Sequence, residues 1–204
     1  PLAKDAIWEA YLRGEGDALH DLIIPVVDGM AREVSTVIDY LLTRSDLIVP
    51  HFATYGFSVA GLMSFLAASC EPRLDAAVML CTPVRYRFMS LGMVYPWDNE
   101  TLEEAKQHDP IARGDRFFPT ALFFGHGTND DLVPVEAVRS VYTSLQPRYE
   151  SAPERIRLSE YPHVRHYLDK LSPYATPQAL AEITQLRVEA HRCLLRFLNP
   201  AVDY

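Results

Sequence analysis

The chain alternates between two patterns of apolar residues, one typical of helices and one of buried strands. From Met30 onward, apolar residues recur every three or four positions and share one face of a helix; they are Val34, Val37, Ile38, Leu41 and Leu42. Strands are then predicted over residues 51–55, 76–81, 120–124 and 156–161. Helices are predicted over residues 58–69, 103–107, 134–145 and 177–198. Residues 1–29 show no clear pattern beyond a short helix over 6–12.

This alternation predicts an α/β fold, with a mostly parallel sheet flanked by helices on both faces. The run 76–81 is continuously apolar, as expected of a strand buried on both faces. The last helix should bury one side, made of Leu180, Ile183, Leu186, Ala190, Leu194 and Phe197. No repeat, low-complexity stretch or linker interrupts the pattern. We therefore expect residues 1–204 to form a single domain, with residues 30–204 as its readable core.

The composition is that of an ordinary globular domain, with 49% hydrophobic and 23% charged residues. Lys and Arg number 19 against 27 Asp and Glu, which gives a formal net charge of −8. An acidic chain without a basic cluster repels phosphate backbones and anionic lipids. We therefore expect neither nucleic acid nor a membrane surface as a partner.

The three cysteines, Cys70, Cys81 and Cys193, lie far apart and form no C-x-x-C pair or Cys/His cluster. We expect them to pack as small hydrophobic side chains, and we expect neither a metal site nor a cofactor. Free thiols are typical of a reducing compartment, so a cytoplasmic location is predicted. The sequence has no signal-peptide pattern and no apolar run near the ~20 residues that span a bilayer.

One serine lies on the turn between a predicted strand and a predicted helix. Gly56, Ser58 and Ala60 form a G-x-S-x-A pattern there. Small residues allow strand and helix to pass close together, and such a turn lifts the serine hydroxyl above the sheet edge. The N–H of Val59 would open the helix and face a developing oxyanion. Taken alone, however, the pattern also fits an ordinary helix N-cap.

Acidic and histidine side chains follow the next strands along the chain. Asp130 and Asp131 lie on a loop after the strand over 120–124, and His163 and His166 follow the strand over 156–161. Parallel strands place their carboxyl ends at one edge of the sheet, where α/β proteins build their sites. Helix capping by either aspartate and surface placement of either histidine remain the alternatives.

Together these segments resemble the C-terminal portion of an α/β-hydrolase, and they are most similar to the dienelactone-hydrolase and prolyl-oligopeptidase-like esterase branches. Members of the family carry a G-x-S-x-G turn, matched here with alanine in the last place. They also carry an H-G-x-x-D-x-x-V-P loop, matched by His126, Gly127, Asp130, Val133 and Pro134. Many end a strand in Y-P-G-V-G-H, matched by Tyr161, Pro162, Val164 and His166.

The resemblance implies a serine hydrolase that cleaves an ester, lactone, thioester or small amide of a small-molecule acyl substrate. Its register selects Asp130 over Asp131 and His166 over His163. Ser58 would then be the nucleophile, His166 the base, and Asp130 the acid that orients His166. The N–H of Val59 would supply one donor of the oxyanion hole. Phe57, Met89, Met93, Tyr95 and Trp97 are candidates for an apolar acyl pocket, although core packing explains such residues equally well.

The family has several strands before the serine turn, and no such segment precedes Ser58 in this sequence. We therefore expect an α/β-hydrolase fold that lacks its N-terminal strands, with the serine strand left as an unpaired edge. Either the chain is a fragment or a partner chain completes the sheet, and the second oxyanion donor is not found here. Two further functions stay open: an acyltransferase or carbon–carbon bond enzyme that uses the same residues, and a non-catalytic binding protein with this fold.

Overall fold

The structure is a computed structural model that describes residues 24–86, 99–168 and 175–198. Its centre is a sheet of four parallel strands in the order β1-β2-β3-β4. Their bounds are Phe52–Phe57, Leu74–Leu80, Ala121–Gly127 and Ile156–Tyr161. The α-helices are α2 (Ile24–Thr43), α3 (Val59–Cys70), α4 (Asn99–His108), α5 (Val135–Leu145) and α6 (Pro177–Leu198), and 3-10 turns cover Pro110–Arg116, Gln146–Tyr149 and Pro153–Arg155. The predicted α/β fold with a parallel sheet is confirmed.

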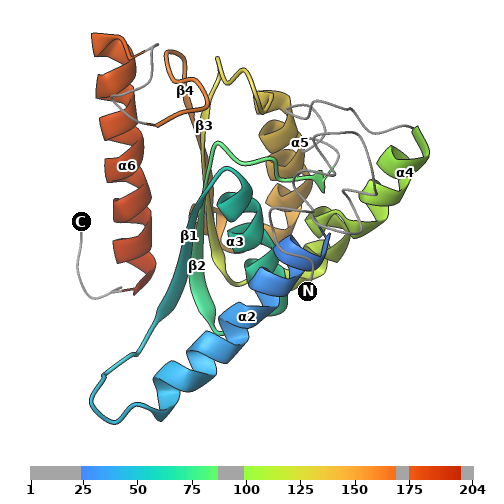
Figure 1. Cartoon of the computed structure of the whole chain (residues 1–204). Helices are drawn as coiled ribbons and strands as arrows, with labels where there is room; N and C mark the ends of the chain where they lie inside the picture. Colours follow the sequence, from blue (N-terminus) through green and yellow to red (C-terminus); the bar gives the residue numbers. More distant parts are fainter. Residues whose placement is uncertain (1–23, 87–98, 169–174, 199–204) are drawn as a thin grey trace, which may run out of the picture.

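Helices cover the two faces of the sheet unequally (Figure 1). Among the described residues, α6 is the one helix against one face of the sheet, whereas α2, α3 and α5 lie on the other side. On the α6 face, Ile183, Leu186 and Ala190 pack against Val78 and Leu80 of β2. These three helical residues belong to the predicted buried side of α6, while Leu180, Leu194 and Phe197 are only half-buried.

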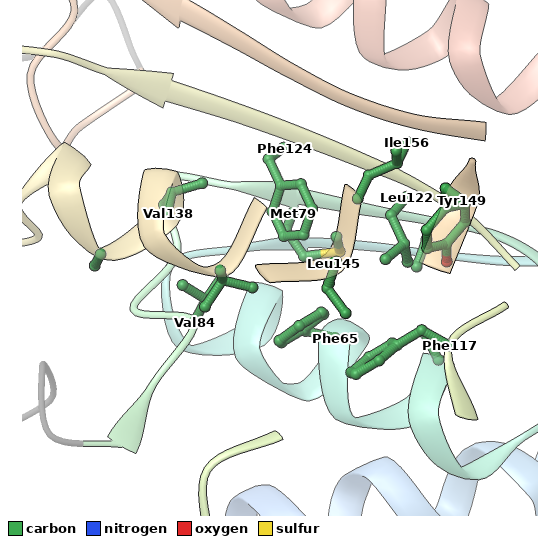
Figure 2. Packing of buried hydrophobic residues seen from close by; sticks show 14 residues of the cluster. Phe65, Met79, Val84, Phe117, Leu122, Phe124, Val138, Leu145, Tyr149 and Ile156 are labelled. Carbon is green, nitrogen blue, oxygen red and sulfur yellow. The ribbon is translucent and has the colours of Figure 1, made fainter. Parts of the chain in front are cut away.

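Strand β2 is buried on both faces, as its unbroken apolar sequence predicts. Val78 and Leu80 belong to the cluster under α6, and Ala77 and Met79 belong to the opposite cluster. Figure 2 shows this opposite cluster, in which Met79 packs with side chains of α3, α5 and β3 and with Phe117, which follows the 3-10 turn Pro110–Arg116; the helix and strand residues include Phe65, Leu122, Phe124, Val138 and Leu145. The alternation along β2 therefore joins the two layers of the core.

Helix α2 spans Ile24–Thr43, so it includes residues before Met30, where the apolar pattern of the sequence becomes clear. Val27 and Asp28 are buried, so the core extends into the segment that shows no pattern in the sequence. The predicted apolar face is only partly correct: Ile38 is buried, but Val37 and Leu42 are exposed.

Strand β1 pairs with β2 and with no other strand in the described part of the chain, as expected for an edge. An apolar groove of about 330 Å³ lies along the first half of β1 and α2, lined by Met30, Glu33, Val34, Val37, Ile38, Leu41, Phe52, Ala53, Thr54 and Leu74. Across the described ranges, no helix is both long and apolar enough to cross a membrane.

Candidate active site

Ser58 occupies a strained turn between β1 and α3. Its backbone has φ 55° and ψ −124°, a conformation that residues with a side chain rarely adopt. The Ser58 N–H donates to the Leu80 carbonyl at 2.8 Å, so β2 holds the turn from one side. On the other side the Ser58 carbonyl accepts from the N–H groups of Gly61 and Leu62, the first bonds of α3. The serine is thus fixed by its neighbours at the carboxyl end of β1.

Gly56 is required because α3 passes directly over it. A Cβ at this position would lie 2.1 Å from the carbonyl oxygen of Ala60, far inside van der Waals contact. The side chain of Ala60 itself is exposed, so the fifth place of the motif accepts alanine here. The second close approach is at Gly61 instead, where a Cβ would lie 1.8 Å from Oγ1 of Thr82.

Val59 is the first residue of α3. The first N–H groups of a helix have no intrahelical acceptor and carry the positive end of the helix dipole. The Val59 N–H follows the serine directly and is therefore suited to face a negative oxygen bound at Ser58.

The Asp130 carboxylate is held by the backbone of its own loop. Its Oδ1 accepts from the N–H groups of Leu132 and Val133 at 2.9 and 2.8 Å. The Asp130 N–H in turn donates to the Gly127 carbonyl at 3.2 Å. The side chain of Asp130 is fully buried, and these donors offset part of the cost of burying its polar oxygens.

The loop that carries His166 packs closely against the aspartate loop. A Cβ on Gly127 would lie 2.2 Å from the Val164 carbonyl oxygen, so the H-G pair of the motif leaves room for the second loop. The Thr128 N–H donates to the Tyr161 carbonyl at 3.1 Å, and the Asn129 side-chain amide donates to the Pro162 carbonyl at 2.6 Å. These contacts fix the distance between Asp130 and His166.

Ser58, His166 and Asp130 form one hydrogen-bonded array across three loops at the carboxyl edge of the sheet. His166 Nδ1 lies 2.9 Å from Asp130 Oδ2, and His166 Nε2 lies 2.9 Å from Ser58 Oγ. Because a carboxylate only accepts, the neutral imidazole carries its proton on Nδ1, and its Nε2 accepts from the serine hydroxyl. The predicted contacts of His166 with both partners are therefore present.

The two alternative residues are engaged elsewhere. Asp131 pairs with Arg165 at 2.6 Å, and His163 Nδ1 lies 2.6 Å from Glu182 on α6. Both pairs lie at the surface and outside the array. The register that selects Asp130 and His166 is the one whose side chains meet.

The fold was compared with known proteins. No protein-family model matches the sequence. An acylaminoacyl peptidase of Pyrococcus horikoshii superposes with a TM-score of 0.64 at 11% identity, over 83% of this chain and 28% of the peptidase. An esterase of Pyrococcus furiosus superposes with a TM-score of 0.61 at 18% identity, over 86% of this chain and 64% of the esterase. The chain has an α/β-hydrolase fold.

A third structure gives the same picture: the esterase domain of a Rhodothermus marinus protein superposes with a TM-score of 0.51 at 12% identity, over 77% of this chain and 68% of that domain. This chain spans less than two thirds of the first proteins it matches. The α/β-hydrolase fold of this chain is therefore a partial one, in agreement with the open edge at β1.

Two residues next to Asp130 were not predicted as site residues. Cys81 follows β2 in a left-handed conformation (φ 46°), and its thiol is buried close enough to Asp130 to feel the charge of that carboxylate. Burial, followed by the negative charge of Asp130, raises the pKa of Cys81, so the thiol stays protonated. His126 is also buried, with Nε2 3.5 Å from Asp130 Oδ2. In the sequence, Cys81 is only the last residue of the predicted strand over 76–81, whereas His126 belongs to the H-G-x-x-D-x-x-V-P loop.

The surroundings of His166 are aromatic on two sides. The ring of Phe57 lies 5.3 Å from the imidazole, and the ring of the exposed Tyr167 meets it edge-on at 5.5 Å. Of the predicted pocket residues, Phe57 is thus at the site, whereas Met89, Met93, Tyr95 and Trp97 lie outside the described residues. The apolar groove along α2 lies at the first half of β1, away from Ser58 at its other end.

Within the described ranges, no group of three or more His, Cys, Asp and Glu side chains is arranged to hold a metal ion. An accessible hydroxyl hydrogen-bonds to a nearly buried imidazole, which hydrogen-bonds to a fully buried carboxylate.

Proposed function

We propose that the protein is a serine hydrolase that cleaves a carboxylic ester or a related acyl bond through Ser58, His166 and Asp130. The observation that carries this proposal is the position of His166, whose two ring nitrogens each lie 2.9 Å from one of the other two side chains. A serine hydroxyl is a weak nucleophile unless an adjacent base removes its proton. The strained turn at Ser58 supports the same role, because strain of this kind gathers at functional sites.

The reaction would begin as Ser58 Oγ attacks the acyl carbon while its proton moves to His166 Nε2. Asp130 holds the imidazole with Nδ1–H toward its carboxylate and stabilises the imidazolium. The carbonyl oxygen becomes an oxyanion, which the Val59 N–H would bind; one such donor is typically worth about 3 kcal/mol in the transition state.

The intermediate then collapses, the bond to the leaving group breaks, and the leaving group takes the proton from His166. This leaves an acyl group on Ser58. A water molecule loses its proton to His166 and attacks the acyl carbon. The acid is released, and the proton returns to Ser58.

The esterases and the peptidase with this fold favour acyl chemistry for this chain as well. We propose a small-molecule acyl substrate, with Phe57 and Tyr167 beside the base as aromatic walls for part of that substrate. Hydrolysis and transfer use the same serine and differ only in the nucleophile that removes the acyl group.

A fluorophosphonate probe tests the nucleophile in the full-length protein. We expect covalent labelling at Ser58, none in Ser58→Ala, and normal labelling in Ser144→Ala, which removes an exposed hydroxyl on α5. A folded protein that leaves Ser58 unlabelled would refute the proposed function.

Neighbouring residues supply matched controls for the other two roles. Short p-nitrophenyl esters serve as substrates for kcat/KM. Asp130→Asn and His166→Ala should each lower kcat/KM by about 10⁴-fold, because the imidazole is lost or adopts the wrong tautomer. Asp131→Asn and His163→Ala, which change the surface pairs with Arg165 and Glu182, should stay near the wild-type value. If Asp131→Asn lowered kcat/KM as much as Asp130→Asn, or His163→Ala as much as His166→Ala, the assignment would be contradicted.

A further inference from the structure

His126 belongs to the H-G-x-x-D-x-x-V-P loop, and the proposed reaction gives it no role. It lies on β3 with only 1% of its surface exposed. Burial of an imidazole costs free energy unless its two ring nitrogens are hydrogen-bonded. Its contacts are therefore informative.

One ring nitrogen makes both polar contacts of His126. Nε2 lies 2.9 Å from the Val133 carbonyl oxygen and 3.5 Å from Asp130 Oδ2. A carbonyl oxygen can only accept, so Nε2 carries the proton. Nδ1 is then an unprotonated acceptor, and it has no hydrogen-bond partner among the described residues.

The charge state of His126 follows from its environment. Burial lowers the pKa of His126, and the Val133 carbonyl and the Asp130 carboxylate only partly offset this effect. The other titratable groups facing the ring are His166, which disfavours the cation, and Glu160, which favours it but is paired with Arg139. His126 is thus a neutral donor at neutral pH.

Val133 links this donor to the site. The Val133 carbonyl accepts from His126, while the Val133 N–H donates to Asp130 Oδ1 at 2.8 Å. The Nε2–H of His126 therefore holds the Val133 peptide, whose own N–H binds Asp130 Oδ1. The same Nε2–H lies near the other carboxylate oxygen, Oδ2. His166 approaches the same carboxylate from the opposite loop.

We propose that His126 is a positioning residue: as a neutral Nε2–H tautomer it orients the Asp130 carboxylate toward His166 and moderates the negative charge that His166 meets. This inference rests on the proposed function. His126 touches neither Ser58 nor the place where an acyl group would bind, so it acts only through Asp130.

Two variants test whether the Nε2–H of His126 matters or only the space that its side chain fills. His126→Gln can place an amide N–H near the position of Nε2, whereas His126→Leu fills space without a donor. His126→Leu should lower kcat/KM for a p-nitrophenyl ester by about 10- to 100-fold, a range typical for residues that orient a functional side chain without touching the substrate. His126→Gln should recover most of the loss.

The pH profile distinguishes positioning from a purely structural role. Without the Nε2–H, the Asp130 carboxylate attracts the charged form of His166 more strongly. The acid-side fall of kcat/KM should therefore move to higher pH in His126→Leu and stay in place in His126→Gln. Lower activity with an unmoved profile, or equal losses in both variants, would overturn the proposal.

The tautomer can be measured in the wild-type protein, whatever the variants do. A long-range ¹H–¹⁵N spectrum at neutral pH should show His126 protonated on Nε2 alone. A proton on Nδ1, or on both nitrogens, would refute the inference. This result does not depend on turnover, so it separates failure of the His126 proposal from failure of the hydrolase proposal, which the Ser58 labelling decides.

Discussion

Substitution of alanine for glycine should have opposite effects on stability at Gly56, where α3 passes over β1, and at Gly29 in α2. In Gly56→Ala the new Cβ would lie 2.1 Å from the oxygen, and 2.3 Å from the carbon, of the Ala60 carbonyl. These are backbone atoms, so no side chain can rotate away, and strand and helix must separate by about 1 Å to restore contact. In Gly29→Ala, within α2, the new Cβ would have no atom of a described residue within 4 Å.

We expect Gly56→Ala to destabilise the protein by about 3 kcal/mol, the upper part of the usual range for overpacking. Gly29→Ala should stabilise it by about 0.5–1 kcal/mol, because alanine restricts the unfolded chain and favours the helix. Urea unfolding measures both: with a slope near 2 kcal/mol per molar, the midpoint should fall by about 1.5 M in Gly56→Ala and rise slightly in Gly29→Ala.

The same separation would move Ser58, which lies between Gly56 and the helix. A misplacement near 1 Å can cost about 100-fold in rate, so the folded fraction of Gly56→Ala should label slowly with the fluorophosphonate. An unchanged urea midpoint in Gly56→Ala would refute the close approach of α3 to β1. A midpoint that falls equally in Gly29→Ala would show that the loss at Gly56 has another cause.

Two further predictions concern stability. Leu186 on α6 is fully buried against β2 and β3, so Leu186→Ala should lower the free energy of unfolding in urea by about 3 kcal/mol. Leu195→Ala, at an exposed position of the same helix, should lower it by under 1 kcal/mol. Similar losses in the two variants would contradict the described buried face of α6. Hydrogen bonds from Arg73 lower the pKa of Glu71 from 4.5 to about 2. Because the folded pKa is depressed, this pair stabilises the fold above pH 4.5, by about 1–3 kcal/mol, and the contribution is lost as pH falls toward 2. The stability difference between wild type and Glu71→Gln should shrink over that range, and a difference that is constant with pH would refute the role of the charge.

Local patterns in the sequence were sufficient to predict the order of elements and the contacts of His166. Strand β2 is recognisable because six consecutive apolar residues suit only a position buried on both faces. Asp130 and His166 are recognisable because each follows a strand, and parallel strands bring their carboxyl ends together. These are properties of short segments, so they can be read from the sequence without knowledge of the tertiary structure.

Other features depend on residues far apart in the sequence and became visible only in the tertiary structure. Helix α2 extends back to Ile24 because Val27 and Asp28 are buried, which the local spacing of apolar residues does not record. Alanine is accepted at position 60 because the tight contact falls on Gly61 and Thr82, and Thr82 belongs to another segment.

The surroundings of Asp130 show the same division. The motif places a histidine and a glycine before the aspartate, but their roles come from distant partners: Gly127 makes room for Val164, and His126 meets a carbonyl and a carboxylate inside a closed loop. Cys81 looks like an ordinary small apolar residue in the sequence, yet burial and the charge of Asp130 raise the pKa of its thiol. Sequence alone determined which side chains could do chemistry, because residue type and strand position are local. The tertiary structure decided how their charges and protons are arranged, because burial and hydrogen bonding depend on the whole fold.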